Sequence, residues 1–119
     1  MNDYEPPAPV VWSLNEIGDV TEIIFSAETP LDGQNTIVWV AQYPCQLTKI
    51  EGLGKDAEIN ARKNGTDLHL DANLVLNTVV KEAPKLKGAD YSEGDTVEIL
   101  IPKSGVPLVD VRLEFVRLK

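Results

Sequence analysis

The feature that most constrains this fold is a two-residue alternation of apolar and polar side chains, clearest between residues 108 and 118. The apolar positions there are every second residue: Val109, Val111, Leu113 and Phe115. Successive side chains of a β-strand point to opposite faces, so this pattern predicts a strand with one buried face. No stretch repeats its apolar residues at helical spacing over three turns. We therefore expect no helix beyond single turns near residues 15–18 and 89–93.

Strand patterns recur along most of the chain. They cover residues 20–27, 36–43, 45–51, 57–63, 66–71, 74–80, 96–101 and 108–118. Both faces of the 36–43 strand are largely apolar, which predicts a central or doubly covered strand. The Gly52-Leu53-Gly54 run is expected to end the 45–51 strand. About eight short strands without crossover helices predict an all-β fold, either a two-sheet antiparallel β-sandwich or a closed barrel.

The strongest local signal is the dipeptide Asn64-Gly65, between two alternating segments. Asparagine and glycine tolerate the positive φ angles that a type I′ hairpin turn requires at both central positions. The sequence therefore predicts a β-hairpin here, with Leu68 and Leu70 of its second arm pointing inward.

The first twelve residues differ from the rest of the chain, and we expect residues 13–119 to form the β-sandwich domain. Prolines prevent a helix and favour an extended path, so residues 1–12 are predicted to form an N-terminal arm. The arm is either a loose terminus or a segment that docks on a neighbouring molecule. Its bulky aromatic residues favour docking. The candidate partner-binding residues are Tyr4, Pro6, Pro7, Pro9 and Trp12.

The charge balance excludes some partners. The chain has 11 basic and 19 acidic residues, a net charge of −8, and its lysines and arginines are scattered. Binding to nucleic acid requires cations that displace counterions from phosphate, so we expect neither nucleic acid nor an anionic membrane surface as a partner. No secretory signal pattern opens the chain. Cys45 is the single cysteine, so folding should not depend on a disulfide, which suits synthesis in a reducing cytoplasm.

Few residues could carry chemistry. His69 is the only histidine, and strand alternation places it on one face with Asp67 and Asp71. These three are weak candidates for metal ligands, because zinc usually requires further nitrogen or sulfur ligands. A solvated polar face is the competing interpretation. The acidic turn Asp90–Asp95 lacks the ligand spacing of a calcium loop. No serine or cysteine has a nucleophile motif around it. We expect no catalytic residues, no cofactor and no enzymatic activity.

The layout from Tyr43 onward resembles a known group of proteins. Its elements are the segments Tyr43–Ile50, Ala57–Thr66, Glu93–Ile101 and the final strand through Phe115. This order resembles small, jelly-roll-like β-sandwich modules of tailed-bacteriophage virions, which serve as head decoration proteins, head fibres and tail appendages.

The resemblance implies a non-enzymatic virion structural protein, made in the host cytoplasm. The most specific expectation is a capsid decoration protein that binds the major capsid protein or another virion protein. It should also assemble with copies of itself, with a trimer as the expected oligomer.

Two other functions remain open at this stage. A carbohydrate- or receptor-binding β-sandwich module would need aromatic rings exposed on one face, because sugars stack on them. Strand alternation leaves two rings free for this purpose, Tyr91 in a turn and Trp12 in the arm. An interaction domain of a cellular pathway is also compatible with the sequence, although no residue selects it.

Overall fold

The computed structural model describes residues 10–28, 30–104 and 106–118, although not the side chains of residues 10–12, 106 and 107. Every regular element in these ranges is a β-strand, and no helix is present that could span a membrane. The all-β prediction is confirmed, whereas the predicted helical turns near residues 15–18 and 89–93 are wrong. The first lies in a strand and the hairpin turn after it, and the second contains a short strand.

Strands of six residues or more form the body of the domain. They are β1 (Val10–Ile17), β2 (Val20–Glu28), β3 (Gln34–Val40), β4 (Cys45–Lys55), β5 (Glu58–Lys63), β10 (Thr96–Lys103) and β11 (Val106–Arg117). Short strands of two residues each connect them, namely β6 (Asp67–Leu68), β7 (Leu74–Val75), β8 (Lys81–Glu82) and β9 (Asp90–Tyr91).

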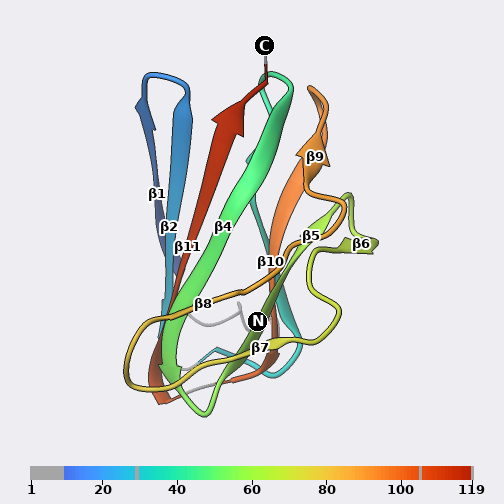
Figure 1. Cartoon of the computed structure of the whole chain (residues 1–119). Coiled ribbons are helices and arrows are strands. Elements are labelled where there is room, and N and C mark those ends of the chain that lie inside the picture. The colour runs from blue at the N-terminus through green and yellow to red at the C-terminus, as the bar shows by residue number, and fades with distance from the viewer. Residues whose placement is uncertain (1–9, 29, 105, 119) are drawn as a thin grey trace, which may run out of the picture.

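The strands form two antiparallel sheets that face each other (Figure 1). The six-stranded sheet has the order β1-β2-β11-β4-β8, with β9 also paired to β4. The five-stranded sheet has the order β3-β10-β5-β6, with β7 also paired to β5. This arrangement confirms the predicted jelly-roll-like antiparallel β-sandwich.

The core lies between the inner faces of the two sheets. The final strand supplies its predicted apolar residues, since Val109, Val111, Leu113 and Phe115 are all at most 2% exposed. The inner faces of β10 and β2 contribute further fully buried residues: Val97, Ile99, Ile101, Ile23 and Phe25. The two-residue period therefore identifies the buried faces of β2, β10 and β11 correctly.

The Asn64-Gly65 hairpin is also confirmed. Asn64 has φ 54° and Gly65 has φ 74°, as a type I′ turn requires, and the turn joins β5 to β6. The side chain of Asn64 adds two hydrogen bonds, because Oδ1 accepts from the Thr96 amide at 2.9 Å and Nδ2 donates to Asp95 at 2.9 Å. The turn is thereby tied to the start of β10.

Two predictions about individual strands are wrong. The strand predicted at residues 36–43 is not covered on both faces: β3 is an edge strand, and its Ile37 and Val40 are 55% and 42% exposed. The glycines at positions 52 and 54 do not end β4, which continues to Lys55. A Cβ at Gly52 would lie 2.9 Å from Ile59 Cδ1 and 3.0 Å from the Asp110 carbonyl oxygen. These glycines therefore mark a close approach inside the sheet rather than a break.

The boundary predicted between arm and domain also differs from the structure. Residues 10–12 belong to β1, which pairs with β2 from Val10↔Ala27 to Ile17↔Val20. The predicted arm residues Tyr4, Pro6, Pro7 and Pro9 lie outside the described residues, as does the side chain of Trp12.

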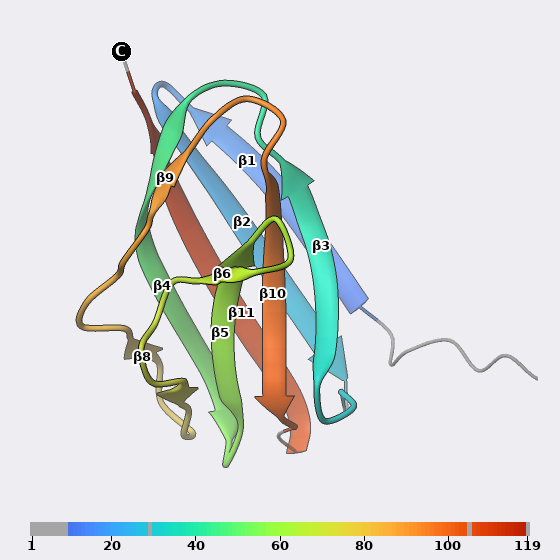
Figure 2. The same cartoon turned by 90° about the vertical axis from the view of Figure 1, so that its right-hand side faces the viewer.

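The strand predicted at residues 74–80 is mostly wrong. Only Leu74 and Val75 form a strand, β7, and the chain then follows an irregular path to β8. Residues 69–95 thus contain only the short strands β7, β8 and β9, and they run over one side of the sandwich (Figure 2).

Candidate functional site

The connecting segments on this side bring the single histidine against a tyrosine. His69, just after β6, is 0% exposed, and Tyr91 in β9 is 2% exposed. His69 Nδ1 lies 2.9 Å from the Lys87 carbonyl oxygen, and Nε2 lies 2.6 Å from the Tyr91 hydroxyl. A carbonyl oxygen can only accept, so Nδ1 carries the proton and Nε2 accepts from the tyrosine. Both ring nitrogens are therefore used within the domain.

The environment of this pair keeps both groups neutral. Burial lowers the pKa of the His69 imidazole below its usual value and raises the pKa of the Tyr91 phenol. The Tyr91 ring also packs edge-on against Phe115, with centroids 5.3 Å apart and planes at 84°. His69 and Tyr91 thus join the connecting segments to the core, and neither is placed to exchange protons with a bound molecule.

The predicted grouping of Asp67, His69 and Asp71 on one polar face is wrong. The strand β6 ends at Leu68, so side-chain alternation does not continue to position 71. His69 turns into the core while Asp67 and Asp71 stay exposed. No three histidine, cysteine, aspartate or glutamate side chains of the described residues lie close enough to hold a metal ion. The structure therefore does not bring these weak candidates together.

The companion prediction that Leu68 and Leu70 both point inward is only half right. Leu70 is buried at 4% exposure, whereas Leu68 is 38% exposed. The same early end of β6 explains the difference, because two adjacent residues, His69 and Leu70, both turn inward after the strand.

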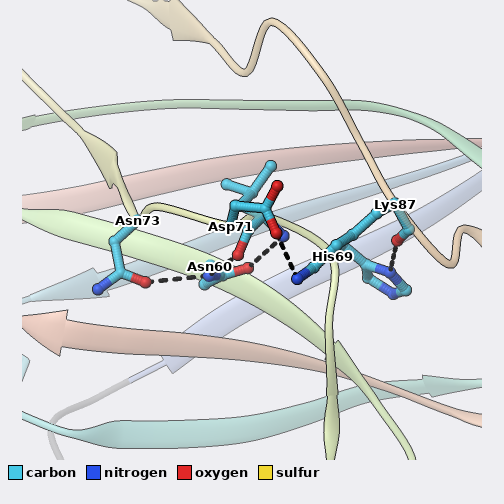
Figure 3. A network of polar contacts seen from close by, with 6 residues as sticks. Asn60, His69, Asp71, Asn73 and Lys87 are labelled. Atoms are coloured by element: carbon cyan, nitrogen blue, oxygen red, sulfur yellow. Dashed lines mark hydrogen bonds and ion pairs between the residues drawn. The ribbon is translucent and has the colours of Figure 1, made fainter.

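A cavity lies beside His69, whose hydrogen bond to the Lys87 carbonyl is drawn in Figure 3. Its volume is about 310 Å³, and its walls are the segments 69–75 and 83–87. Its apolar wall residues include Leu74, Val75, Pro84 and Leu86. The cavity could accommodate a small apolar group.

Several polar side chains beside this cavity are already paired with one another or with the backbone. Asn60 is 2% exposed; its Nδ2 donates to the Leu70 carbonyl at 3.2 Å and to Asn73 Oδ1 at 2.9 Å. Its Oδ1 accepts from the amides of Ala61 and Leu70. Lys87 Nζ forms an ion pair with Asp71, which lowers the pKa of that carboxyl group. These contacts hold the 69–73 segment against β5, so their role is structural.

Cys45 is not a nucleophile in this environment. Its side chain is 0% exposed, and burial, together with the charge of Asp95, raises the pKa of the thiol to about 11. A thiolate is the reactive form of cysteine, and it is disfavoured here at neutral pH. Cys45 therefore serves as a small, fully buried core residue.

The acidic turn 90–95 is built from hydrogen bonds within the fold. Asp95 accepts from the Ser92 amide at 2.8 Å, as well as from Asn64, and both bonds lower the pKa of its carboxyl group. Asp90 accepts from Gln46 Nε2 at 3.0 Å. Asp95 therefore caps the turn before β10.

The described aromatic rings are poorly exposed for stacking against a sugar. Tyr91, which the sequence pattern left free, is buried, so that prediction is wrong. Phe25 and Phe115 are fully buried, and Trp39 packs against Phe115 with centroids 5.3 Å apart. Trp39 and Tyr43 are half-buried. Among the side chains that the structure describes, no aromatic ring is fully exposed.

The sequence interpretation missed the residues of β1. The described side chains of this strand, Ser13 to Ile17, are all exposed, and Ile17 is 77% exposed. A signal was present, because a two-residue Gly-Asp connection between apolar residues is typical of a hairpin. Gly18 has φ 60°, which fits the first central position of a type II′ turn.

Comparisons with known proteins give little beyond a likeness in fold. No family model matches the sequence, and no curated protein matches it. Among solved structures, the cupin domain of Schizosaccharomyces pombe Cnp3 has a TM-score of 0.44 and 11% identity over 92% of this chain. KdgF from a Halomonas species has a TM-score of 0.40 and 10% identity, with 99% of this chain and 86% of that chain covered. A RmlC-like cupin from Shewanella frigidimarina has a TM-score of 0.34 and 8% identity, with 87% and 83% covered.

These similarities carry no argument about function. All three TM-scores are below 0.5, and the chain spans only 65% of the length of the Cnp3 domain.

Proposed function

We propose that this chain is a non-enzymatic structural protein of a tailed-bacteriophage virion, which decorates the head by binding the major capsid protein and copies of itself. The observation that carries the non-enzymatic part is the burial of His69, the only histidine of the chain, with both ring nitrogens bonded inside the domain. A general acid or base must reach the proton that it transfers, and this imidazole has no free position.

Two features support a role in the virion: the order of segments in the sequence, and the apolar side chains exposed at the strand edges. The layout from Tyr43 to Phe115 resembles that of virion β-sandwich modules. Large apolar side chains are exposed on the strand edges, with Ile17 at 77% and Ile37 at 55%. Exposed apolar groups at strand edges favour contacts between proteins over contacts with small molecules.

Virion composition tests this proposal. Particles grown from the phage whose genome encodes the chain should contain it in an amount comparable to the major capsid protein, as measured by mass spectrometry of gradient-purified particles. Particles assembled without the chain should bind the recombinant protein, with added density on the head in electron micrographs. Purified particles that never contain or bind the chain would refute the proposal.

The N-terminal arm can be tested separately. A truncation that removes residues 1–9 preserves β1, which begins at Val10, so its melting temperature should equal that of the full chain. Under the proposed function, the truncated protein should be retained less well on particles. Equal retention would show that residues 1–9 do not dock on the capsid.

A further inference from the structure

The strand β1 ends the six-stranded sheet, and no other described strand pairs with its outer edge. It pairs only with β2, and the register runs without a shift over eight residue pairs. Figure 2 shows β1 and β3, which belong to different sheets, both toward the side of the sandwich away from β4 and β8. The β1 edge of one sheet and the β3 edge of the other therefore lie on the same side of the molecule.

Hairpin geometry indicates which backbone groups of β1 are free. A two-residue turn closes on a hydrogen-bonded pair, here Ile17 and Val20. Hydrogen-bonded and non-hydrogen-bonded pairs alternate along an antiparallel ladder, so the odd positions of β1 bond to β2. The amide and carbonyl groups of positions 12, 14 and 16 consequently point away from the sheet.

This edge lacks the features that normally prevent strands from pairing. Protected edges carry lysines, prolines or bulges, or they are very short. Residues 10–17 contain no lysine and no proline, and Glu16 is their single charged residue. By contrast, the other free edge, β3, has a register shift where it pairs with Val97 and Glu98. Of the two edges, β1 is the better template for an added strand.

The inner face of β1 is also incompletely covered. Leu14 lies opposite Ile23, which is 0% exposed, and residues opposite each other share a face of the sheet. Leu14 nevertheless remains 38% exposed. The six-stranded sheet thus extends past the edge of its partner sheet, and a strand added to β1 would bring a second apolar surface to Leu14.

We propose that β1 pairs antiparallel with β1 of a second copy around a two-fold axis at Leu14, which joins two six-stranded sheets into one continuous sheet. In this register position 14 faces itself and position 12 faces position 16, so all the outward backbone groups of these positions find partners. The interface is the same surface on both copies, as two-fold symmetry requires. The inference rests on the self-assembly in the proposed function, and it replaces the trimer expected from the sequence with a dimer.

The one charged side chain of β1, Glu16, does not oppose a second copy in this register. Glu16 faces position 12 of the other copy, and the two Glu16 residues are four positions apart along the ladder. At 3.3 Å per residue this is about 13 Å, beyond a Debye length of about 8 Å at physiological salt. The single charge of the strand is therefore not placed against its own copy.

Solution mass tests the dimer. Light scattering after gel filtration should give twice the chain mass of 13.1 kDa for the wild type. Leu14→Lys places two cations at the two-fold axis and should halve the mass while the chain stays folded, since Leu14 is partly exposed. Ile37→Lys is the matched control, because it puts the same charge on the exposed β3 edge, and it should leave the mass doubled.

A cross-link tests the register. Opposed residues of a hydrogen-bonded pair have Cα atoms about 5.5 Å apart, within the range of a disulfide. Oxidised Leu14→Cys should therefore run as a covalent dimer. Asn15→Cys should stay monomeric under denaturing conditions, because position 15 faces position 13. The native Cys45 is buried and should not react.

A wild-type chain that is monomeric up to its solubility limit, or trimeric, would overturn the inference. So would dissociation by Ile37→Lys but not by Leu14→Lys, since the β3 edge would then be the interface. A dimer that forms only after removal of residues 1–9 would also overturn it, because that segment would then occupy the edge. A monomeric chain that still binds particles would refute the dimer but not the binding to the capsid. A dimeric chain that is absent from particles would refute the binding to the capsid but not the dimer.

Discussion

Replacement of Phe115 by alanine should test whether one central strand holds the two sheets together. Phe115 is 0% exposed on β11, and its ring lies 5.3 Å, centroid to centroid, from both Trp39 of β3 and Tyr91 of β9. Phe→Ala changes in protein cores cost about 3–5 kcal/mol, and aromatic pairs contribute about 0.5–1.5 kcal/mol each beyond their buried area. We therefore expect a loss near the upper end, about 5 kcal/mol. Domains of this size have about 5–15 kcal/mol in total, so the variant should be marginally stable.

Urea unfolding followed by far-ultraviolet circular dichroism measures this loss. The midpoint should fall while the slope of unfolding free energy against urea stays constant. At about 4 °C per kcal/mol, the melting temperature should drop by about 20 °C. Val116→Ala, on the outer face of the same strand, is the control and should cost less than about 1 kcal/mol. A cost below about 2 kcal/mol for Phe115→Ala, or equal costs for both variants, would refute this account of the core.

Three further outcomes can be measured by chemical or thermal unfolding. Burial lowers the folded-state pKa of His69 below the value of about 6.5 for a free imidazole, so the free energy of unfolding should fall as the pH drops below 6.5. His69→Gln should remove this pH dependence, and an unchanged dependence would exclude His69 as its source. Gly52→Ala should lower the free energy of unfolding by about 1–3 kcal/mol, because the new methyl group overpacks against Ile59 Cδ1. Adding Ile59→Val to the same chain should restore part of this free energy. An unchanged stability for Gly52→Ala would contradict the close approach. Asn64→Ala should lower the free energy of unfolding by about 1–2 kcal/mol through lost hydrogen bonds and a strained positive φ. Asn64→Gly relieves the strain and should lower it by less. The reverse order would be inconsistent with the turn geometry.

Long alternating segments made most of the fold predictable. A strand such as β11 sorts its side chains onto two faces over many residues, so its buried set follows from the period alone. Asn64-Gly65 fixed one turn, because few other dipeptides accept its backbone angles. The edge position of β3 was not predictable in this way. An apolar residue such as Ile37 looks the same in a sequence whether it packs in a core or stays exposed at a strand edge.

The surroundings of His69 were not predictable from local pattern. The prediction assumes that side-chain alternation continues beyond Leu68, whereas β6 ends at that residue. The burial of the imidazole depends on partners 18 and 22 residues further along the chain, Lys87 and Tyr91. No sequence period encodes such a contact. The same holds for Gly52, because its tight packing depends on Ile59 and Asp110 from other strands.

The buried thiol at the start of β4 provides a chemical probe of how often the domain opens. Cys45 is the only cysteine, and the native sandwich keeps its sulfur away from solvent and from the thiolate form. A disulfide reagent in solution can therefore modify the chain only during the moments when the two sheets separate around β4. The labelling rate gives the frequency of those moments, and its growth with denaturant distinguishes local breathing from complete unfolding. The native Cys45 can therefore be used to measure how often the domain opens around β4, without any engineered probe.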